Sequence, residues 1–314
     1  MEKTDRILVT GSNGFLGKAL LSKLRGRGYT NLVLFTKEEY DIVKEAEVDR
    51  LFKEKGPFDV VIHLAAVIGG IGFNKRNPGL SFYGNLMMNT LMQEYSRINK
   101  VKKFVGIGSV CEYPKFTEVP FKEKNLWDGY PEETNAPYGL SKKMMLVQSQ
   151  AYREQYGFNG IHLLQVNLYG PWDNFSLNDS HVIAALILKF HNAKEKNLNE
   201  VTLWGTGSAS REFLYVEDAA EAIVLAMERY DKSEPVNIGA SRELTIKEVA
   251  EIISKNIGFK GKIIWDTSKP DGQPRRCLDT SKAKEEFGFT AKTSFEEGIK
   301  KTVEWYESQK KKGL

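Results

Sequence analysis

The chain has 314 residues, of which 41% are hydrophobic and 27% charged, with a formal net charge of +4. This composition is typical of a globular protein and excludes a low-complexity or collagen-like chain; no signal peptide and no run of about 20 apolar residues is found, so no membrane contact is expected. Cys111 and Cys277 are too few for a disulfide framework, which favours a cytoplasmic protein, and the basic run 310–312 is typical of a solvated tail, not of nucleic-acid binding.

The first stretch with a recognisable pattern is an apolar run at 7–10, followed by spaced glycines and a helical pattern at 18–24. A buried parallel strand that leads into a helix has this pattern. Glycines there permit a tight turn, the approach of a pyrophosphate to the backbone, and close packing of helix on strand. The alternative is an ordinary strand–helix turn with spare glycines. The expected dinucleotide loop consists of Gly11, Ser12, Asn13, Gly14, Phe15, Leu16 and Gly17.

Strand-like and helical patterns then alternate through the first half of the chain. This rhythm predicts an α/β fold with a doubly wound parallel sheet, right-handed crossovers and ligands at the carboxyl ends of the strands. Strands are expected at 32–35, 59–66, 103–109 and 160–166, a glycine-rich loop at 68–72, and helices around 49–52, 84–99 and 138–156.

From about residue 170 the alternation loosens, and short strands are expected at 200–204 and 262–265 among loops and helices. We therefore expect two domains. Residues 1–168 would bind the dinucleotide and residues 169–314 would face the substrate, with some exchange of strands and helices between them.

The choice between NAD and NADP depends on the end of the second expected strand. An NAD-preferring protein carries an acidic residue there for the ribose 2′-hydroxyl. This chain has Lys37, whose charge suits a 2′-phosphate, so NADP(H) is favoured. The neighbouring Glu38 and Glu39 leave NAD(H) open.

Ser109, Tyr138 and Lys142 form the strongest candidate for catalysis. Tyr138 and Lys142 are four residues apart and share one face of the expected helix, and Ser109 ends the fourth expected strand. An ammonium beside a phenol would lower the pKa of Tyr138 and make it an acid or base near neutral pH. Ser109 would hydrogen-bond a ketone oxygen at which hydride arrives or leaves. The alternative is a chance Tyr-x-x-x-Lys on an amphipathic helix.

These motifs resemble the extended short-chain dehydrogenases/reductases and, among them, the GDP-L-fucose synthase family. The resemblance covers essentially the whole chain, in the stretches 69–71, 108–114, 135–142, 155–157, 167–175, 180–183, 204–207, 211–214 and 268–272. It implies a Rossmann-like NADP-binding domain, a smaller α+β substrate domain, a GDP-sugar substrate and a homodimer, with no metal.

The resemblance also implies a second chemistry. Cys111 and His181 stand where the family has its epimerising pair, which would invert a carbon next to the ketone while Tyr138 and Ser109 hold the enolate. The alternatives are a small buried thiol and a histidine that only hydrogen-bonds. His63, His162, His191 and Cys277 are expected to be structural.

Further site residues are implied by the resemblance alone. For the cofactor they are Lys37, Asp41, Leu64, Ala65, Ala66, Ile107, Gly108, Lys142, Asn167, Leu168 and His181. For the GDP-sugar they are Asn167, Lys189, Trp204, Arg211, Lys269 and Asp271.

Four positions depart from the family pattern. Val110 replaces a second serine, Glu112 an apolar residue, Ala184 a proline and Lys189 an arginine. Two of them flank Cys111. The sequence therefore predicts a reductase at C4 of a GDP-4-keto-6-deoxy sugar that also epimerises C3 and C5. Two alternatives stay open: a C4 reductase of a related GDP-4-keto heptose or deoxysugar without epimerase activity, and a dinucleotide-binding sensor without turnover.

The basic residue after the second strand predicts at least a tenfold preference for NADPH over NADH in kcat/KM. A charged contact to the 2′-phosphate contributes about 1.5–3 kcal/mol. Lys37→Ala should reduce the preference. Steady-state kinetics with both cofactors measures it, and equal efficiencies for the wild type would contradict it.

Overall fold

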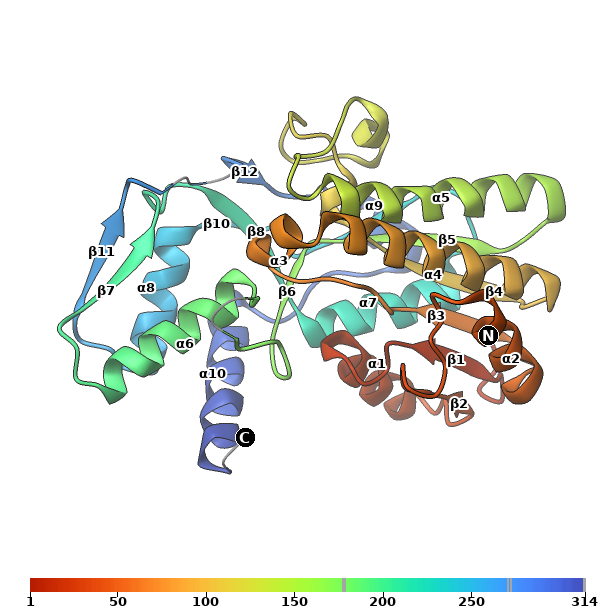
Figure 1. Ribbon diagram of the computed structural model, residues 1–314, viewed down its shortest axis with the longest axis horizontal. Coiled ribbons are helices and arrows are strands. Elements are labelled where there is room, and N and C mark those ends of the chain that lie inside the picture. Colours follow the sequence, from red (N-terminus) through yellow and green to blue (C-terminus); the bar gives the residue numbers. More distant parts are fainter. Residues whose placement is uncertain (177–178, 270, 272, 313–314) are drawn as a thin grey trace.

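The computed structural model describes residues 1–176, 179–269, 271 and 273–312, with only the backbone of Ile71. Its centre is a six-stranded parallel sheet in the order β2-β1-β3-β4-β5-β9 (Figure 1). The strands are β1 (Ile7–Thr10), β2 (Leu32–Val33), β3 (Val60–His63), β4 (Lys103–Ser109), β5 (Gly160–Gln165) and β9 (Val236–Ile238). The chain builds outward from β1 to β2 and then returns to β3 on the other side of β1. This reversal is typical of a doubly wound, Rossmann-like fold, so the predicted fold class is confirmed.

Helices cover both faces of this sheet (Figure 1). Side chains alternate along each strand, so Ile7 and Val9 join a core with α1 (Phe15–Gly26) and α7 (Val216–Arg229), while Leu8 joins a core on the opposite face. Both faces are therefore apolar, which explains the continuous apolar runs of the sequence. The opposite face is covered by α2 (Glu45–Lys55), α4 (Pro78–Ile98) and α5 (Ala136–Tyr156), and the short α3 (Ile71–Arg76) precedes α4.

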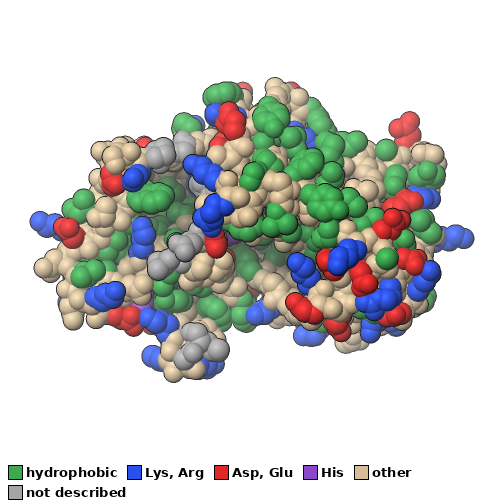
Figure 2. Space-filling model, in the orientation of Figure 1, with side chains coloured by type: hydrophobic (Ala, Val, Ile, Leu, Met, Phe, Trp, Pro, Cys, Tyr) green, Lys and Arg blue, Asp and Glu red, His purple; other side chains and the backbone are tan. Residues whose placement is uncertain are grey.

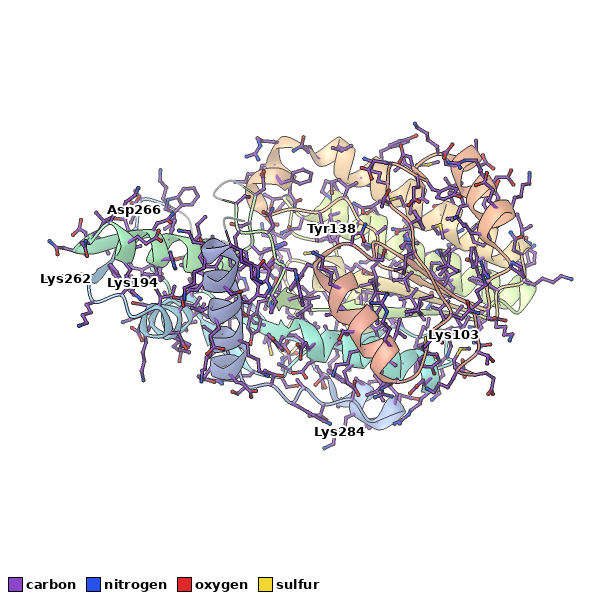
Figure 3. All side chains as sticks on the ribbon, turned by 90° about the horizontal axis from the view of Figure 1, so that it is seen from below. Lys103, Tyr138, Lys194, Lys262, Asp266 and Lys284 are labelled. Atoms are coloured by element: carbon purple, nitrogen blue, oxygen red, sulfur yellow. The ribbon has the colours of Figure 1, made fainter. Side chains whose placement is uncertain are left out.

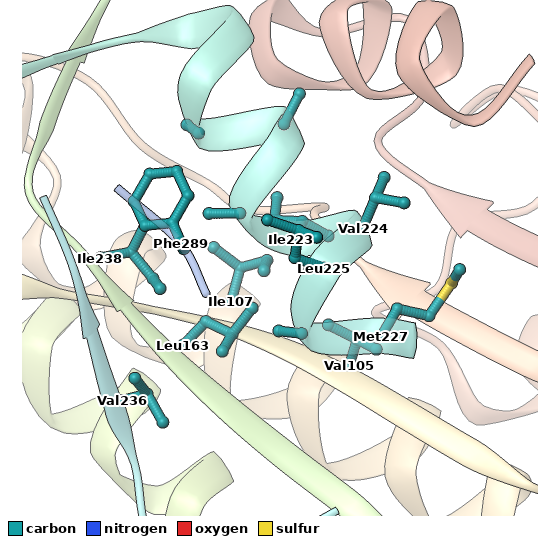
Figure 4. Packing of buried hydrophobic residues seen from close by; sticks show 14 of the residues in the cluster. Val105, Ile107, Leu163, Ile223, Val224, Leu225, Met227, Val236, Ile238 and Phe289 are labelled. Atoms are coloured by element: carbon teal, nitrogen blue, oxygen red, sulfur yellow. The ribbon is translucent and has the colours of Figure 1, made fainter. Parts of the chain in front are cut away.

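Figure 4 shows the packing beneath the centre of the sheet, where Val105, Ile107 and Leu163 meet Ile223 of α7 and Ile238 of β9. All five side chains are at most 8% exposed. Because α7 and β9 follow residue 168 but complete the first core, the second half of the chain contributes to this sheet. The division at residue 168 remains a prediction.

The rest of the chain forms a second core, which includes Phe190, Ile253 and Ile299. Three helices contribute to it: α6 (Val182–Glu195), α8 (Ile246–Ile257) and α10 (Phe295–Lys311). Two small sheets accompany them. The first joins β10 (Glu243–Thr245), β8 (Ser210–Tyr215) and β12 (Arg275–Arg276), with β6 (Asn167–Tyr169) paired to β8, and the second joins β7 (Glu200–Trp204) to β11 (Lys262–Asp266). Helix α9 (Ser281–Phe287) packs with the first core.

Most element boundaries follow local chemistry. Helix α4 begins at Pro78, earlier than the expected residue 84, because proline suits the first turn of a helix. Strand β3 ends at His63 because the hydroxyl of Thr10 takes the next two backbone N–H groups, those of Leu64 and Ala65. Strand β2 is shorter than expected. Among the described residues, no helix is long and apolar enough to cross a lipid bilayer.

The close packing at the first turn of α1 predicts that a substitution at Gly17 lowers the stability of the fold. A Cβ on Gly17 would lie 2.3 Å from the Gly11 carbonyl oxygen and 2.6 Å from that of Ser12. We expect Gly17→Ala to lower the free energy of unfolding by about 1–3 kcal/mol, because backbone atoms must move. Urea unfolding followed by circular dichroism measures the change.

Gly26 is the matched control at the other end of the same helix, because a Cβ there meets nothing within 4 Å. Gly26→Ala should be neutral or should stabilise by up to about 1 kcal/mol. Identical unfolding midpoints for Gly17→Ala and the wild type would contradict the prediction.

Candidate active site

The glycine-rich loop fits closely against the end of β3. Gly11 has φ +67°, and a Cβ on it would lie 2.9 Å from the Ala65 backbone nitrogen. Ser12 Oγ is buried and has no hydrogen-bond partner among the described residues. This cradle lies at the carboxyl ends of β1 and β3, where the strand order reverses and where open α/β sheets bind ligands. Together with the N-terminus of α1 it can hold a pyrophosphate.

A buried hydrogen-bonded chain connects this loop to α5. Thr10 Oγ1 accepts the N–H groups of Leu64 and Ala65, so its own hydrogen points to His63 Nδ1, 2.9 Å away. His63 Nε2 lies 3.1 Å from Asn89 Oδ1, and Asn89 Nδ2 donates to the Ser141 carbonyl. Burial and the charge of Lys142 lower the pKa of His63 to about 3. His63 is thus a neutral link in this chain.

The other residues expected at the cofactor lie around the same sheet edge. Lys37 is exposed after β2, and the half-buried Asp41 pairs with Lys44 at 3.5 Å. Leu64, Ala65 and Ala66 are partly exposed at the end of β3. Their contacts with a cofactor remain predictions, as do those of Ile107, Gly108, Asn167 and Leu168, which lie on β4 and β6.

The carboxyl end of β4 carries a capping box. Ser109 caps the 3-10 helix 110–112: its Oγ accepts the Cys111 N–H at 3.2 Å, and its own N–H donates to Glu112 Oε1 at 2.8 Å. Helix α5 approaches this turn at Gly139, where a Cβ would lie 2.1 Å from the Cys111 carbonyl oxygen. The approach brings Tyr138 next to Ser109 and Cys111, so the structure joins three of the predicted catalytic residues.

Burial dominates the electrostatics of the two catalytic residues on α5. It raises the pKa of Tyr138 well above its ordinary value, helped by the charges of Cys111 and Glu112 and opposed by a hydrogen bond from Ser109. The expectation of a lowered Tyr138 pKa is wrong for this structure: the pKa is raised, because desolvation of the phenol prevails. Burial also lowers the pKa of Lys142 to about 8, and the charge of Glu112 opposes this. Tyr138 is therefore a protonated acid at neutral pH.

A cation missed by the sequence analysis lies against Cys111. Arg276 Nη1 is 3.7 Å from Cys111 Sγ, and Gln273 Oε1 holds the same guanidinium at 2.6 Å from Nη2. Arg276 pairs in register with Arg211 of β8, and burial together with the charge of Arg276 lowers the pKa of Arg211 to about 10. In the sequence, the only sign of a cation at this place is the pair Arg275-Arg276, which follows the 268–272 motif.

His181 caps the N-terminus of α6 and faces a carboxylate that the sequence analysis also missed. His181 Nδ1 lies 3.8 Å from Asp173 Oδ1. The Asp173 side chain is 5% exposed, and its Oδ2 has no partner among the described residues. The loop after β3 supports this segment, because the Gly70 N–H donates to the Asp179 carbonyl at 3.0 Å. A role for His181 opposite Cys111 remains a prediction.

The residues expected at the GDP-sugar lie on the second core and its small sheets. Lys189 is half-buried, and burial lowers its pKa. Trp204 is 70% exposed. The Asp271 carboxylate accepts the Thr206 N–H at 2.7 Å and the Thr206 hydroxyl at 2.8 Å, and these bonds lower its pKa. Lys269 is exposed, and residues 270 and 272 of the same motif lie outside the described residues.

Tyr138 lies in the middle of the molecule, between the sheet helices and the end that carries Lys262 and Asp266 (Figure 3). Among the residues expected to be structural, His162 is buried against Glu112, and His191 lies 3.5 Å from Glu195. Burial raises the pKa of the Cys277 thiol to about 12, which keeps it protonated. Tyr138 of α5 and Arg276 of β12 thus both lie beside Cys111.

Three comparisons give this site a context. Residues 7–239 match the model of the NAD dependent epimerase/dehydratase family. A putative GDP-L-fucose synthase 2 from Arabidopsis thaliana is 42% identical over 306 residues, which are 98% of this chain and 93% of that protein.

Two solved structures are similar over almost their whole length. The crystal structure of a GDP-6-OMe-4-keto-L-xylo-heptose reductase from C. jejuni has a TM-score of 0.91 and 32% identity, and covers 98% of this chain and 99% of that one. A GDP-L-fucose synthetase from Naegleria fowleri bound to NADP has a TM-score of 0.89 and 29% identity, and covers 99% of this chain and 96% of that one.

Proposed function

The chain belongs to the NAD dependent epimerase/dehydratase family, and we propose that it reduces C4 of a GDP-4-keto-6-deoxy sugar with NADPH and also epimerises C3 and C5. It would thus be an NADP-dependent oxidoreductase and epimerase. One observation carries the proposal: the turn after β4 and the start of α5 bring Ser109, Cys111 and Tyr138 together. The similarity to GDP-L-fucose synthases supports the substrate class.

The loop of Gly11 and Gly17 suits a dinucleotide. Both glycines pack so closely on backbone atoms that a Cβ would clash, and the buried Ser12 hydroxyl, which has no partner among the described residues, suits a phosphate. Lys37 would bind the 2′-phosphate and Lys142 the nicotinamide ribose. NADPH, when bound, supplies hydride.

In the reduction, Tyr138 donates its proton to the C4 oxygen. Its phenol is protonated because burial raises its pKa, so it serves as an acid in the reductive direction. Ser109 donates a hydrogen bond to the same oxygen, and the Lys142 charge stabilises the developing phenolate. A positioned general acid contributes about 10²–10⁴-fold to such a rate.

In the epimerisation, Cys111 removes a proton beside the ketone and His181 returns one from the opposite face. Arg276 is placed to assist the first step, because its Nη1 lies 3.7 Å from the Cys111 sulfur. Asp173 supports the second step by orienting the imidazole. Tyr138 and Ser109 hold the enolate oxygen between the two steps.

For the nucleotide sugar, Arg211 and Arg276 form a cationic pair that fits a diphosphate, and Lys189 would add to it. Trp204 offers an exposed ring for stacking on the base. Asn167, Lys269 and Asp271 complete the proposed substrate set, although Asp271 must share its carboxylate with Thr206.

We further propose a cytoplasmic homodimer. Helices α4 and α5 present exposed apolar side chains, and Figure 2 shows hydrophobic side chains gathered over these helices. They are Leu80, Phe82, Tyr83, Met144 and Val147, each 37–57% exposed. A self-complementary apolar face of this kind suits a twofold interface. If the protein sediments as a monomer at micromolar concentration, the proposed dimer is wrong. Neither a nucleic acid nor a membrane is expected as a partner.

Two other functions are weaker candidates. A C4 reductase of a related GDP-4-keto heptose, without epimerisation, is favoured by the unusual Val110 and Glu112 and by the similarity to the heptose reductase. A dinucleotide sensor would need no buried proton donor, so Tyr138 argues against it. NADPH oxidation with a panel of GDP-4-keto sugars distinguishes these possibilities.

In that assay, Tyr138→Phe should lower kcat at least 100-fold and leave NADPH binding within about threefold, because the phenol is the proton donor and does not contact the cofactor phosphates. Stopped-flow turnover and fluorescence titration measure the two quantities. Activity within threefold of the wild type would remove Tyr138 from this role.

Deuterium exchange tests the epimerase step. Incubation with a GDP-4-keto-6-deoxy sugar in D₂O without NADPH should introduce deuterium at C3 and C5, because the abstracted proton exchanges with solvent. Cys111→Ser should suppress the exchange, since a thiol with an ordinary pKa of about 8.5 ionises near neutral pH to give a base, whereas a serine hydroxyl stays protonated.

The same variant should still reduce an already epimerised keto sugar, because Ser109, Tyr138 and Lys142 are unchanged. Normal C4 reduction by the wild type without any deuterium uptake would favour the reductase without epimerase activity.

A further inference from the structure

A glutamine that the proposed mechanism does not use connects two segments of the candidate site. Gln273 is half-buried and lies just before β12. Its Nε2 donates to the Lys115 carbonyl at 2.9 Å, and its Oε1 accepts two hydrogen bonds from Arg276, at 2.6 Å from Nη2 and 3.2 Å from Nε. Lys115 follows Cys111 by four residues. The amide therefore joins the segment behind the turn after β4 to the arginine beside the thiol.

These contacts allow only one orientation of each group. A carbonyl only accepts and a guanidinium only donates, so the Gln273 nitrogen faces Lys115 and its oxygen faces Arg276. The oxygen occupies the edge of the guanidinium that Nε and Nη2 form. Because the guanidinium is planar, Nη1 lies on its other side, and this nitrogen is 3.7 Å from Cys111 Sγ. Gln273 thus determines which side of Arg276 faces the thiol.

The neighbouring Arg275 makes the same kind of contact with a charged partner. Its Nε and Nη2 bind the Glu243 carboxylate at 3.0 and 2.6 Å, and this ion pair is exposed on the Arg275 side. Arg276 is only 9% exposed, and within the described part of the chain no carboxylate binds it. The neutral amide of Gln273 therefore fixes the guanidinium without cancelling its charge.

We propose that Gln273 is a positioning residue of the candidate site: it holds Arg276 with Nη1 toward Cys111 and leaves the guanidinium charge free for an anionic group of the substrate. A buried charge without a counter-ion destabilises a fold, so its presence is explained by a ligand that compensates it. The strand itself has a separate anchor, because Glu212 accepts the Leu278 N–H at 2.7 Å. The choice of ligand rests on the proposed function, whereas the orientation of the guanidinium does not.

The charge beside the thiol can be measured without any substrate. Cys111 is partly exposed, and iodoacetate and iodoacetamide attack the same thiolate, although only iodoacetate is anionic. The ratio of the two rate constants cancels the amount of thiolate and reports the charge near the sulfur. Mass spectrometry of the Cys111 peptide separates it from Cys277. At low salt the ratio of the wild type should exceed that of Arg276→Met by about threefold to fivefold, and added salt should reduce the difference.

Two substitutions test Gln273 itself. Gln273→Glu keeps an oxygen for the guanidinium but cancels its charge, so the ratio should fall to about that of Arg276→Met. Gln273→Met removes both contacts and releases the guanidinium, so the ratio should fall at least about twofold. Either variant decides the matter if the other does not fold. A ratio that stays within about 1.3-fold of the wild type would overturn the proposal, as would a wild-type Cys111 that neither reagent modifies.

Glu243→Gln is the matched control. It exchanges a carboxylate for an amide at the same edge of Arg275, which points to the other face of β12 because side chains alternate along a strand. The ratio at Cys111 should not change. An equal fall in this variant would mean a general disturbance of β12 and would overturn the proposal.

A double variant tests whether Gln273 acts through the arginine. Gln273→Met combined with Arg276→Met should give the same ratio as Arg276→Met alone, because the group that Gln273 positions is then absent. A further fall in the double variant would mean that Gln273 affects the thiol by another route, through the loop at Lys115, and would contradict the positioning of Arg276.

Kinetics test the part that rests on the proposed function. Gln273→Glu should raise the KM for the GDP-sugar at least about tenfold, because the substrate loses a charged partner, and should leave the Kd of NADPH within about twofold. In the Arg276→Met background the same substitution should not raise the KM further. An unchanged KM, with the expected alkylation ratios, would overturn the role of this charge in substrate binding. Absence of turnover in the wild type, with those ratios intact, would instead contradict the proposed function alone.

Discussion

The geometry of the site depends on one close contact between two backbones. At Gly139 the start of α5 lies against the carbonyl of Cys111, with no space for a Cβ. The contact holds Tyr138 beside Ser109. Because α5 is a regular helix, Lys142 then lies one turn further along the same helix face. The capping box of Ser109 and Glu112 stiffens the other partner in this contact. Tyr138 and its neighbour Ser109 are thus positioned by main-chain packing rather than by flexible side chains.

Around this contact, the structure balances several buried charges. Burial raises the pKa of Tyr138 and lowers that of Lys142, so it favours the neutral form of both side chains. Glu112 opposes the loss of charge on Lys142, while burial, helped by the charge of Lys142, keeps His63 neutral. The neutral His63 then completes the hydrogen-bonded chain from the glycine-rich loop to α5. The glycine-rich loop and α5 are therefore linked by a chain of buried hydrogen bonds that passes through a neutral histidine.

The second half of the chain supplies other side chains of the candidate site. Arg276 reaches Cys111 from β12, and Asp173 with His181 precedes α6. The loop around Gly70 contacts the segment before His181, because the Gly70 N–H donates to the Asp179 carbonyl.

Much of this could be predicted from the sequence, because it depends on short-range order. The apolar runs and spaced glycines determined the parallel sheet and the loop at Gly11, and the spacing of Tyr138 and Lys142 determined their shared helix face. Only the tertiary structure decided what surrounds those groups. Burial reversed the expected direction of the Tyr138 pKa, and strand pairing brought Arg276 to Cys111 and His162 to Glu112 across 165 and 50 residues. Desolvation and long-range contacts depend on how the helices and strands pack together, and this packing cannot be predicted from any local pattern in the sequence.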